Sequence, residues 1–226
     1  MSHVRLPPLF ACAMSLALAG CLGTSRPSRF YTLAPLQIRD GSGSTATDAT
    51  LAIGPVEIPD YVARQQIVTR TGTNELVVAE FDRWGSSLDS EISGSLVATL
   101  RDRLESQQIA VAPWRSAIFS GVGVTYRAAV SISRFDGIPG QSVVLQGRWE
   151  LIAQSSGKKE SLGVREATVT EKIDASGYDA LVAAMQRALV RFGQQMADTV
   201  VAAMQMAKAP CQTRRVQTAH GMRDSR

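Results

Sequence analysis

The chain has 226 residues, of which 45% are hydrophobic and 19% charged, so it is long enough to bury one sizeable core. Its formal net charge is +4, but the last twenty residues alone carry +4 and Arg5 adds another positive charge, which leaves about −1 for residues 21–206. A nearly neutral globular part argues against nucleic-acid binding, which requires a clustered basic face.

Residues 1–20 have the composition of an export signal. Arg5 lies in a short leading segment, and an apolar run of about ten residues follows, Leu9 to Leu18. This run is too short for a membrane span, which needs roughly twenty residues. The four residues Leu18-Ala19-Gly20-Cys21 match a bacterial lipoprotein cleavage site, whereas an ordinary signal peptide leaves Cys21 unexplained. The sequence therefore predicts lipid attachment at Cys21.

The sequence predicts four segments. Residues 1–20 form the signal peptide, 21–28 the lipidated cysteine and a short tether, 29–209 a single domain, and 210–226 a basic disordered tail. Leu22 stands where an aspartate would favour retention at the inner membrane. We therefore expect the chain on the periplasmic face of the outer membrane.

Short strands and turns fill the first part of the domain. Residues 41–48 have the composition of a flexible linker. Pro55 cannot donate to a strand ladder, so its strand lies at a sheet edge or contains a bulge. A turn at Thr71–Asn74 predicts a hairpin. The expected strands are Arg29–Leu33, Leu51–Ile58, Gln66–Arg70 and Glu75–Ala79.

A helix is predicted next. Ser86–Asp89 fits a capping signature, and acidic residues near the start with basic ones near the end suit the helix dipole. Its apolar stripe predicts packing against a sheet and comprises Leu88, Ile92, Leu96, Val97, Leu100 and Leu104.

The second half of the domain favours an antiparallel sheet with one solvated face. After a short strand at Ile109–Val111, three longer strands are expected at 124–136, 141–154 and 162–172. In the middle one, apolar residues alternate with polar ones. The apolar set is Val143, Leu145, Trp149 and Leu151, and the polar set is Gln146, Arg148 and Glu150.

A long helix is predicted over residues 177–208. Its spacing of apolar residues is compatible with packing across the sheet. Its C-terminal half carries Met196, Met204 and Met206, which suit an adaptable contact with another subunit or a partner. Both interpretations stay open at this point. The predicted fold class is α/β, with a mixed, largely antiparallel sheet covered by two main helices in a single domain.

Catalytic and metal chemistry have little support in the sequence. His3 and His220 lie in the terminal segments, and Cys211 is the one cysteine left after the signal peptide and the lipidated position. The folded part therefore has no imidazole for general-base work and no cysteine cluster for a metal. No Walker A glycine loop is present either. We expect no enzyme activity, no cofactor and no metal.

A family resemblance appears along residues 21 to about 104. Phe30-Tyr31-Thr32-Leu33 follows the cleavage site, and the block Ile58 to Arg70 has the pattern I-P-x-Y-(L/V)-x-R-x-Q-I-V-x-R. Asn74-Glu75-Leu76 and Phe81-Asp82-Arg83-Trp84 continue it. These stretches resemble the auxiliary lipoproteins of ABC-type transporters, of PqiC/YmbA type. One departure is Gly85-Ser86-Ser87-Leu88, where relatives commonly have Ala-Glu-Pro-Leu.

The resemblance implies a function. It implies attachment to the periplasmic leaflet of the outer membrane and a role in moving phospholipid or other hydrophobic molecules between membranes. The implied partners are an MCE-domain (PqiB-like) protein that forms a bridge and, through it, an inner-membrane ABC or PqiA-like complex. Members of such a family are expected to form homo-oligomers.

Four residues of the resembling blocks are candidates for partner contact: Tyr61, Arg64, Arg70 and Trp84. The alternative is that their guanidinium and ring groups cover an apolar edge of the domain. Met196 and Met204 complete the candidate set. Two other functions also stay open. One is a lipid carrier with a cavity between the sheet and the helices, and the other is an assembly lipoprotein of another envelope complex, such as a secretion pore.

Overall fold

The computed structural model describes residues 26–33, 49–119, 123–155 and 158–208. The predicted signal peptide, the predicted lipidation site Cys21, the predicted linker at 41–48, Cys211 and the predicted basic tail lie outside these residues.

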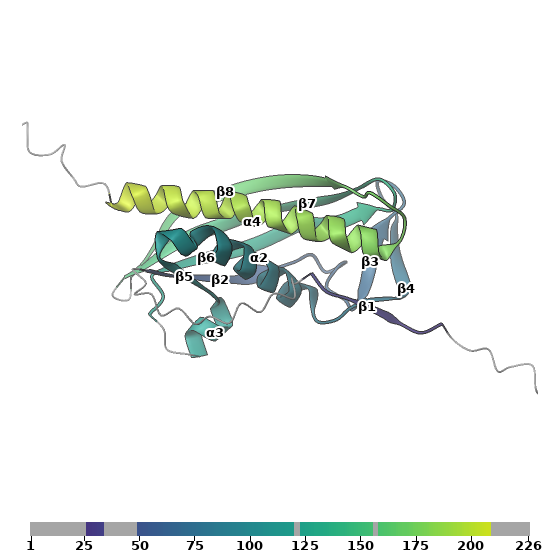
Figure 1. Ribbon diagram of the computed structural model, residues 1–226, viewed down its shortest axis with the longest axis horizontal. Coiled ribbons are helices and arrows are strands. Elements are labelled where there is room, and N and C mark those ends of the chain that lie inside the picture. The colour runs from purple at the N-terminus through teal and green to yellow at the C-terminus, as the bar shows by residue number, and fades with distance from the viewer. Residues whose placement is uncertain (1–25, 34–48, 120–122, 156–157, 209–226) are drawn as a thin grey trace, which may run out of the picture.

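The larger of two sheets has five strands in the order β5-β2-β6-β7-β8 (Figure 1). Strand β2 (Ala49–Glu57) pairs in parallel with β5 (Ile109–Pro113) and with β6 (Tyr126–Ile138). The long strands β6, β7 (Ser142–Ser155) and β8 (Lys158–Lys172) then pair antiparallel. The predicted mixed sheet with a long antiparallel part is confirmed.

A smaller sheet has three strands in the order β1-β4-β3. The predicted hairpin is confirmed, because β3 (Gln66–Arg70) and β4 (Leu76–Trp84) pair antiparallel. Strand β1 (Arg29–Tyr31) joins β4 in parallel at residues 82–84. Strand patterns predict where strands run but not how they divide between sheets, so this second sheet was not foreseen.

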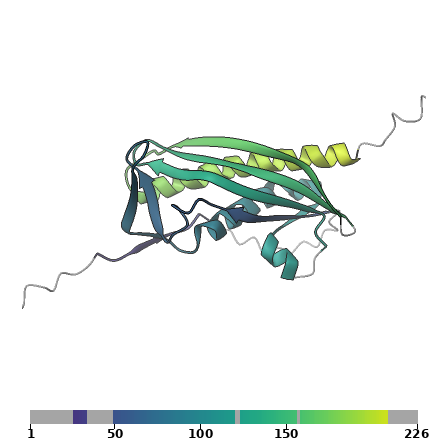
Figure 2. The same cartoon turned by 180° about the vertical axis from the view of Figure 1, so that it is seen from behind.

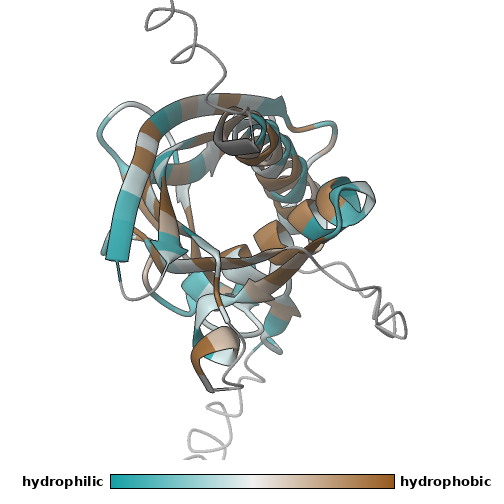
Figure 3. Cartoon of the chain, turned by 90° about the vertical axis from the view of Figure 1, so that its left-hand side faces the viewer, coloured by the Kyte–Doolittle hydropathy of each residue, from teal (hydrophilic) through white to brown (hydrophobic). Residues whose placement is uncertain are grey.

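Two long helices cover one face of the larger sheet. Helix α2 (Leu88–Leu104) and helix α4 (Tyr178–Lys208) lie side by side, and the sheet curves around them when the molecule is viewed along its length (Figures 1 and 3). The helices approach closely at Gly193, where an added Cβ would lie 3.0 Å from the Thr99 side chain. All six residues of the predicted α2 stripe are buried, which confirms that helix and its orientation.

The core lies between the helices and the sheet. The four apolar residues predicted on one face of β7 are all buried, and the ring of Trp149 meets that of Phe192 edge-on at 5.0 Å between centroids. On the other face, Gln146 and Arg148 are exposed. Seen from behind, this face of the sheet carries no covering helix along β7 and β8 (Figure 2). The prediction of one solvated face is confirmed.

Three local features refine the sequence predictions. Strand β2 is interior in the strand order, but its pairing with β5 ends at Ile53, so Pro55 lies beyond that ladder, and a register shift against β6 between Ile53 and Val56 confirms the predicted bulge. Ser87 caps α2 in an extended conformation, but its side chain bonds to Ser90 rather than to a backbone amide. Two short helices, η2 (Glu105–Gln107) and α3 (Trp114–Phe119), were not predicted.

None of the helices among the described residues has the length and apolar composition of a membrane span.

Candidate partner-binding site

The four candidates from the resembling blocks, Tyr61, Arg64, Arg70 and Trp84, all lie between the end of β2 and the start of α2. In the structure these four residues lie in two separate places. Tyr61 and Arg70 point to a buried carboxylate in the larger sheet, whereas Arg64 and Trp84 line a pocket.

The buried carboxylate belongs to Asp136 of β6, whose side chain is fully inaccessible to solvent. The Tyr61 hydroxyl donates to Asp136 Oδ2 at 2.7 Å, and Arg70 Nε donates to the same oxygen at 2.8 Å. Arg134 Nε donates to Oδ1 at 3.0 Å. We call these four residues the Asp136 cluster. Because Arg70 lies on β3, the cluster ties the smaller sheet to the larger one.

Stacking and electrostatics support a structural role for this cluster. The Arg70 guanidinium lies 5.6 Å from the centroid of the Tyr61 ring. Burial raises the pKa of the Tyr61 phenol, and its hydrogen bond to Asp136 raises that pKa further. The hydrogen bond to Asp136 likewise raises the pKa of Arg70. The polar groups of Tyr61 and Arg70 are therefore engaged within the domain, at a buried carboxylate that the sequence analysis did not foresee.

A second buried carboxylate holds β1 against α2. Glu91, in the first turn of the helix, accepts hydrogen bonds from Thr32 Oγ1 at 2.7 Å, the Leu33 amide at 2.9 Å and Ser86 Oγ at 2.7 Å. An acidic residue in a first helical turn also suits the helix dipole. The Phe30-Tyr31-Thr32-Leu33 stretch is thus fixed to the start of α2.

Tyr31 fixes β1 to β4. Its hydroxyl donates to Asp82 Oδ1 at 2.8 Å, and burial, with this hydrogen bond as the second cause, raises the pKa of Tyr31 to about 12. Trp84, directly opposite Tyr31 in the ladder, is almost fully buried. These contacts and those of Glu91 hold the walls of the pocket in place.

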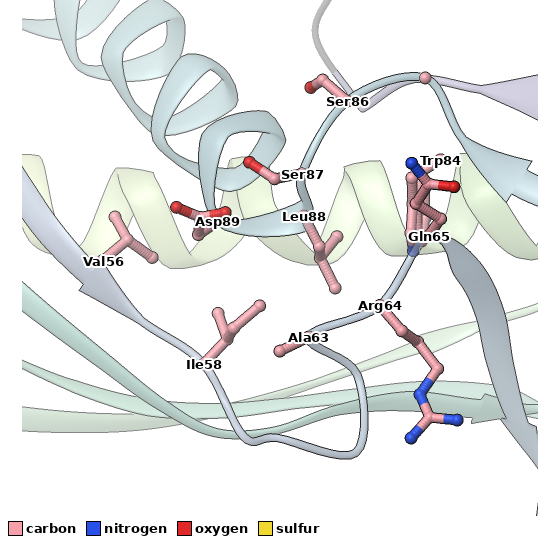
Figure 4. A pocket seen from close by; sticks show the side chains of 11 residues that line it. Val56, Ile58, Ala63, Arg64, Gln65, Trp84, Ser86, Ser87, Leu88 and Asp89 are labelled. Carbon is pink, nitrogen blue, oxygen red and sulfur yellow. The ribbon is translucent and has the colours of Figure 1, made fainter.

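The pocket opens between the end of β2, the 58–65 segment and the start of α2, and has a volume of about 410 Å³ (Figure 4). This is within the range of small-molecule sites and large enough for a bulky side chain of a partner. Arg64 and Asp89 lie on opposite sides of Leu88, and the Arg64 side chain points away from both Leu88 and Asp89. The lining residues are Val56, Ile58, Ala63, Arg64, Gln65, Trp84, Gly85, Ser86, Ser87, Leu88 and Asp89.

Arg64 is exposed, and its guanidinium forms no hydrogen bond or ion pair with any residue that the structure describes. The backbone around it is fixed, because the Arg64 amide donates to Val62 O at 2.8 Å and the Trp84 amide donates to Gln65 O at 2.7 Å. A fixed backbone with an unpaired cation beside a pocket of mixed apolar and polar lining can bind an apolar group that carries a negative charge.

The two candidate methionines lie elsewhere. Met196 is fully buried and Met204 is 7% exposed, both in the core under α4, whereas Met206 is 72% exposed. The packing of the helix across the sheet accounts for Met196 and Met204, and we leave them out of the candidate site. Sequence analysis missed the pocket residues Val56 and Ile58, and no periodic signal would have separated them from ordinary strand residues.

Side chains fill the space between the sheet and the helices in which a lipid cavity was one alternative. Val143, Leu145, Trp149 and Leu151 pack in one cluster with side chains of α2 and α4. A filled core therefore accounts for this face of the sheet.

Comparison with known proteins identifies the family. The sequence profile of the family described as "ABC-type transport auxiliary lipoprotein component" matches residues 31–197, which begin at the last residue of β1 and include the Asp136 cluster and the whole pocket lining. The chain belongs to this family. The resemblance of the sequence blocks is thereby confirmed. Because the family is an auxiliary component of transport, the chain is a non-enzymatic protein.

Individual relatives agree with this assignment. The chain is 29% identical over 170 residues to the intermembrane transport lipoprotein PqiC of Escherichia coli K12, covering 74% of this chain and 83% of PqiC; PqiC of Shigella flexneri gives the same values. A crystal structure of an uncharacterized protein superposes with a TM-score of 0.61 at 25% identity, over 77% of this chain and 99% of the other. A Xanthomonas campestris protein at 18% identity has the same fold, with a TM-score of 0.60 over 80% and 98% of the two chains.

Proposed function

We propose that this protein is the outer-membrane accessory lipoprotein of an intermembrane lipid transport system and that it docks an MCE-domain bridge to that membrane. Three observations support the proposal: the family, the similarity to a protein named as an intermembrane transport lipoprotein, and the cleavage site before Cys21. Acyl chains on Cys21 would hold the domain at the periplasmic face of the outer membrane.

We propose the Arg64 pocket as the docking site for the MCE-domain partner. The observation that carries this is an arginine without a charged partner in the described part of the chain, in the lining of a pocket that also presents apolar side chains. The occupant is a segment of the partner with an apolar side chain in the pocket and a carboxylate on Arg64. Apolar anchors with a matched charge at the rim give both affinity and selectivity.

The test is partner capture after crosslinking in cells, with a tag at the C-terminus. The unaltered protein should recover an MCE-domain protein with an ABC or PqiA-like complex behind it, and Arg64→Glu should lose it through charge reversal. Arg148→Glu, on the exposed face of β7, is the matched control and should recover the partner normally. Recovery of a secretion or assembly pore by the unaltered protein would refute the transport function. If Arg64→Glu and Arg148→Glu recovered the MCE-domain protein equally well, the pocket would be refuted as the docking site, but the transport function would not.

The anchor needs its own test. Cys21→Ser should block lipidation and release the domain from membranes as soluble protein or unprocessed precursor. A variant that still fractionates with the outer membrane and supports transport would contradict the anchor. We also propose that copies of the chain assemble with one another, which native mass spectrometry of the gently solubilised complex measures.

A further inference from the structure

The smaller sheet carries exposed apolar side chains near both ends of β4, with Phe30 opposite Arg83 and the others at the start of the strand. Phe30 of β1 is 67% exposed, and three consecutive residues at the start of β4, Leu76, Val77 and Val78, are each about 40% exposed. This sheet forms one end of the elongated molecule, at the right of Figure 1, whereas α3 and the C-terminal end of α4 lie toward the opposite end. We call the end formed by β1, β3 and β4 the near end.

The near end is also where the chain emerges toward Cys21. Residue 26 is only five positions after the cysteine, and an extended chain spans at most about 3.6 Å per residue, so Phe30 lies within about 32 Å of Cys21 even at full extension. Helix α4 has 31 residues, or about 46 Å at 1.5 Å per residue, and it runs away from the near end. A tether of this length keeps the near end within reach of the membrane when Cys21 is lipidated, whereas the far end of α4 lies farther from it.

Charge at the near end is balanced. Arg29 is paired with Asp179 at 2.7 Å, and Glu75 and Glu80 flank the exposed apolar residues of β4. A contact between this surface and a bilayer would therefore be governed by apolar burial and would depend little on anionic lipid.

We propose that the near end contacts the phospholipid bilayer directly, with Phe30 and Val77 in the interfacial layer, and so sets the domain upright on the membrane. This inference rests on the proposed attachment at Cys21. The contact orients the pocket and the far end of α4 with respect to the membrane, because it adds a second point of attachment to the acyl chains.

Spin labels on the full lipidated chain test the contact. Phe30→Cys and Val77→Cys report the near end, Ile118→Cys is the matched control because Ile118 is also exposed but lies on α3, and all three carry Cys211→Ala. In vesicles of phosphatidylethanolamine with phosphatidylglycerol, labels at 30 and 77 should lose access to a water-soluble relaxation agent and gain access to oxygen. The label at 118 should be unchanged, and vesicles without phosphatidylglycerol should give the same result.

Three results would overturn the proposal. Labels at 30 and 77 as open to water as the label at 118, on protein that floats with the vesicles, would show a domain held only by its acyl chains. Shielding of labels 30 and 77 before vesicles are added would show that a second copy covers the surface. The third result is an intact mass of the mature chain that shows no acyl groups. This mass would refute the anchor at Cys21 and, with it, the proposed membrane contact.

Discussion

Arg64 and Arg70 lie six residues apart in the same sequence block, yet the fold uses them in opposite ways. The Arg70 side chain is 18% exposed and bound to a fully buried carboxylate, whereas Arg64 is exposed at the rim of a pocket with no acidic partner among the described residues. A single recognisable block thus supplies both a scaffold contact and a candidate binding group. Family resemblance alone does not tell these two roles apart.

The difference follows from which element carries each residue. Arg70 ends β3, which packs on β6, so its side chain reaches Asp136. Arg64 precedes β3 in a segment held by backbone hydrogen bonds, which leaves the side chain unconstrained. A buried ion pair is costly to break, because the remaining partner is left uncompensated, whereas an exposed unpaired arginine contributes little to stability.

The largest effect is expected from Asp136→Ala. Removing this carboxylate leaves Arg70, Arg134 and the Tyr61 hydroxyl without their shared acceptor, so we expect a loss of about 3–5 kcal/mol in the free energy of unfolding. Urea unfolding measures this loss. Asp174→Ala is the control, because Asp174 is 70% exposed and pairs with Arg187 at 3.0 Å, a surface pair worth about 1 kcal/mol or less. Similar losses in both variants would contradict the scaffold role of the Asp136 cluster.

Periodic patterns predicted the parts of the fold that depend on one buried face. The α2 stripe from Leu88 to Leu104 and the alternation along β7 both place their apolar side chains in the core as expected. These patterns are local and depend only on the geometry of one element. The six-residue helix α3 was missed because it is too short to show a period.

The Asp136 cluster lay beyond sequence reasoning because it depends on contacts between distant segments. Tyr61 is 75 residues from Asp136 and Arg70 is 66 residues away, and a register shift between Ile132 and Arg134 interrupts the alternation of β6 just before the cluster. The sequence blocks that indicated the family therefore singled out Tyr61, Arg64, Arg70 and Trp84. They could not show which of these residues hold the fold together and which line a binding site. Only the position of the smaller sheet decides which of them meets a buried carboxylate.

A second prediction concerns Tyr31, which fixes a wall of the pocket. Its pKa is about 12 in the folded protein against about 10 when unfolded, so the folded state retains the phenolic proton that the unfolded state loses. Its contribution to stability is therefore complete below pH 10 and is lost as the pH rises to 12. Chemical unfolding across this interval should show a shallower decline for Tyr31→Phe than for the unaltered protein. Parallel declines would mean that Tyr31 ionises equally in both states.

The smallest effect on stability is expected from Arg64→Ala, and it bears directly on the contrast with Arg70. Because the Arg64 guanidinium has no partner in the described structure, its removal should change the free energy of unfolding by no more than about 0.5 kcal/mol. Arg70→Ala removes a charged hydrogen bond to buried Asp136 and should cost about 1.5–3 kcal/mol. Urea unfolding of the two variants, with partner capture measured on the same preparations, separates the roles. Arg64→Ala should lose capture while remaining stable, and Arg70→Ala should lose stability first. If Arg64→Ala were as destabilising as Arg70→Ala, both arginines would belong to the scaffold, and the pocket would have lost the charge on which its assignment as a docking site depends.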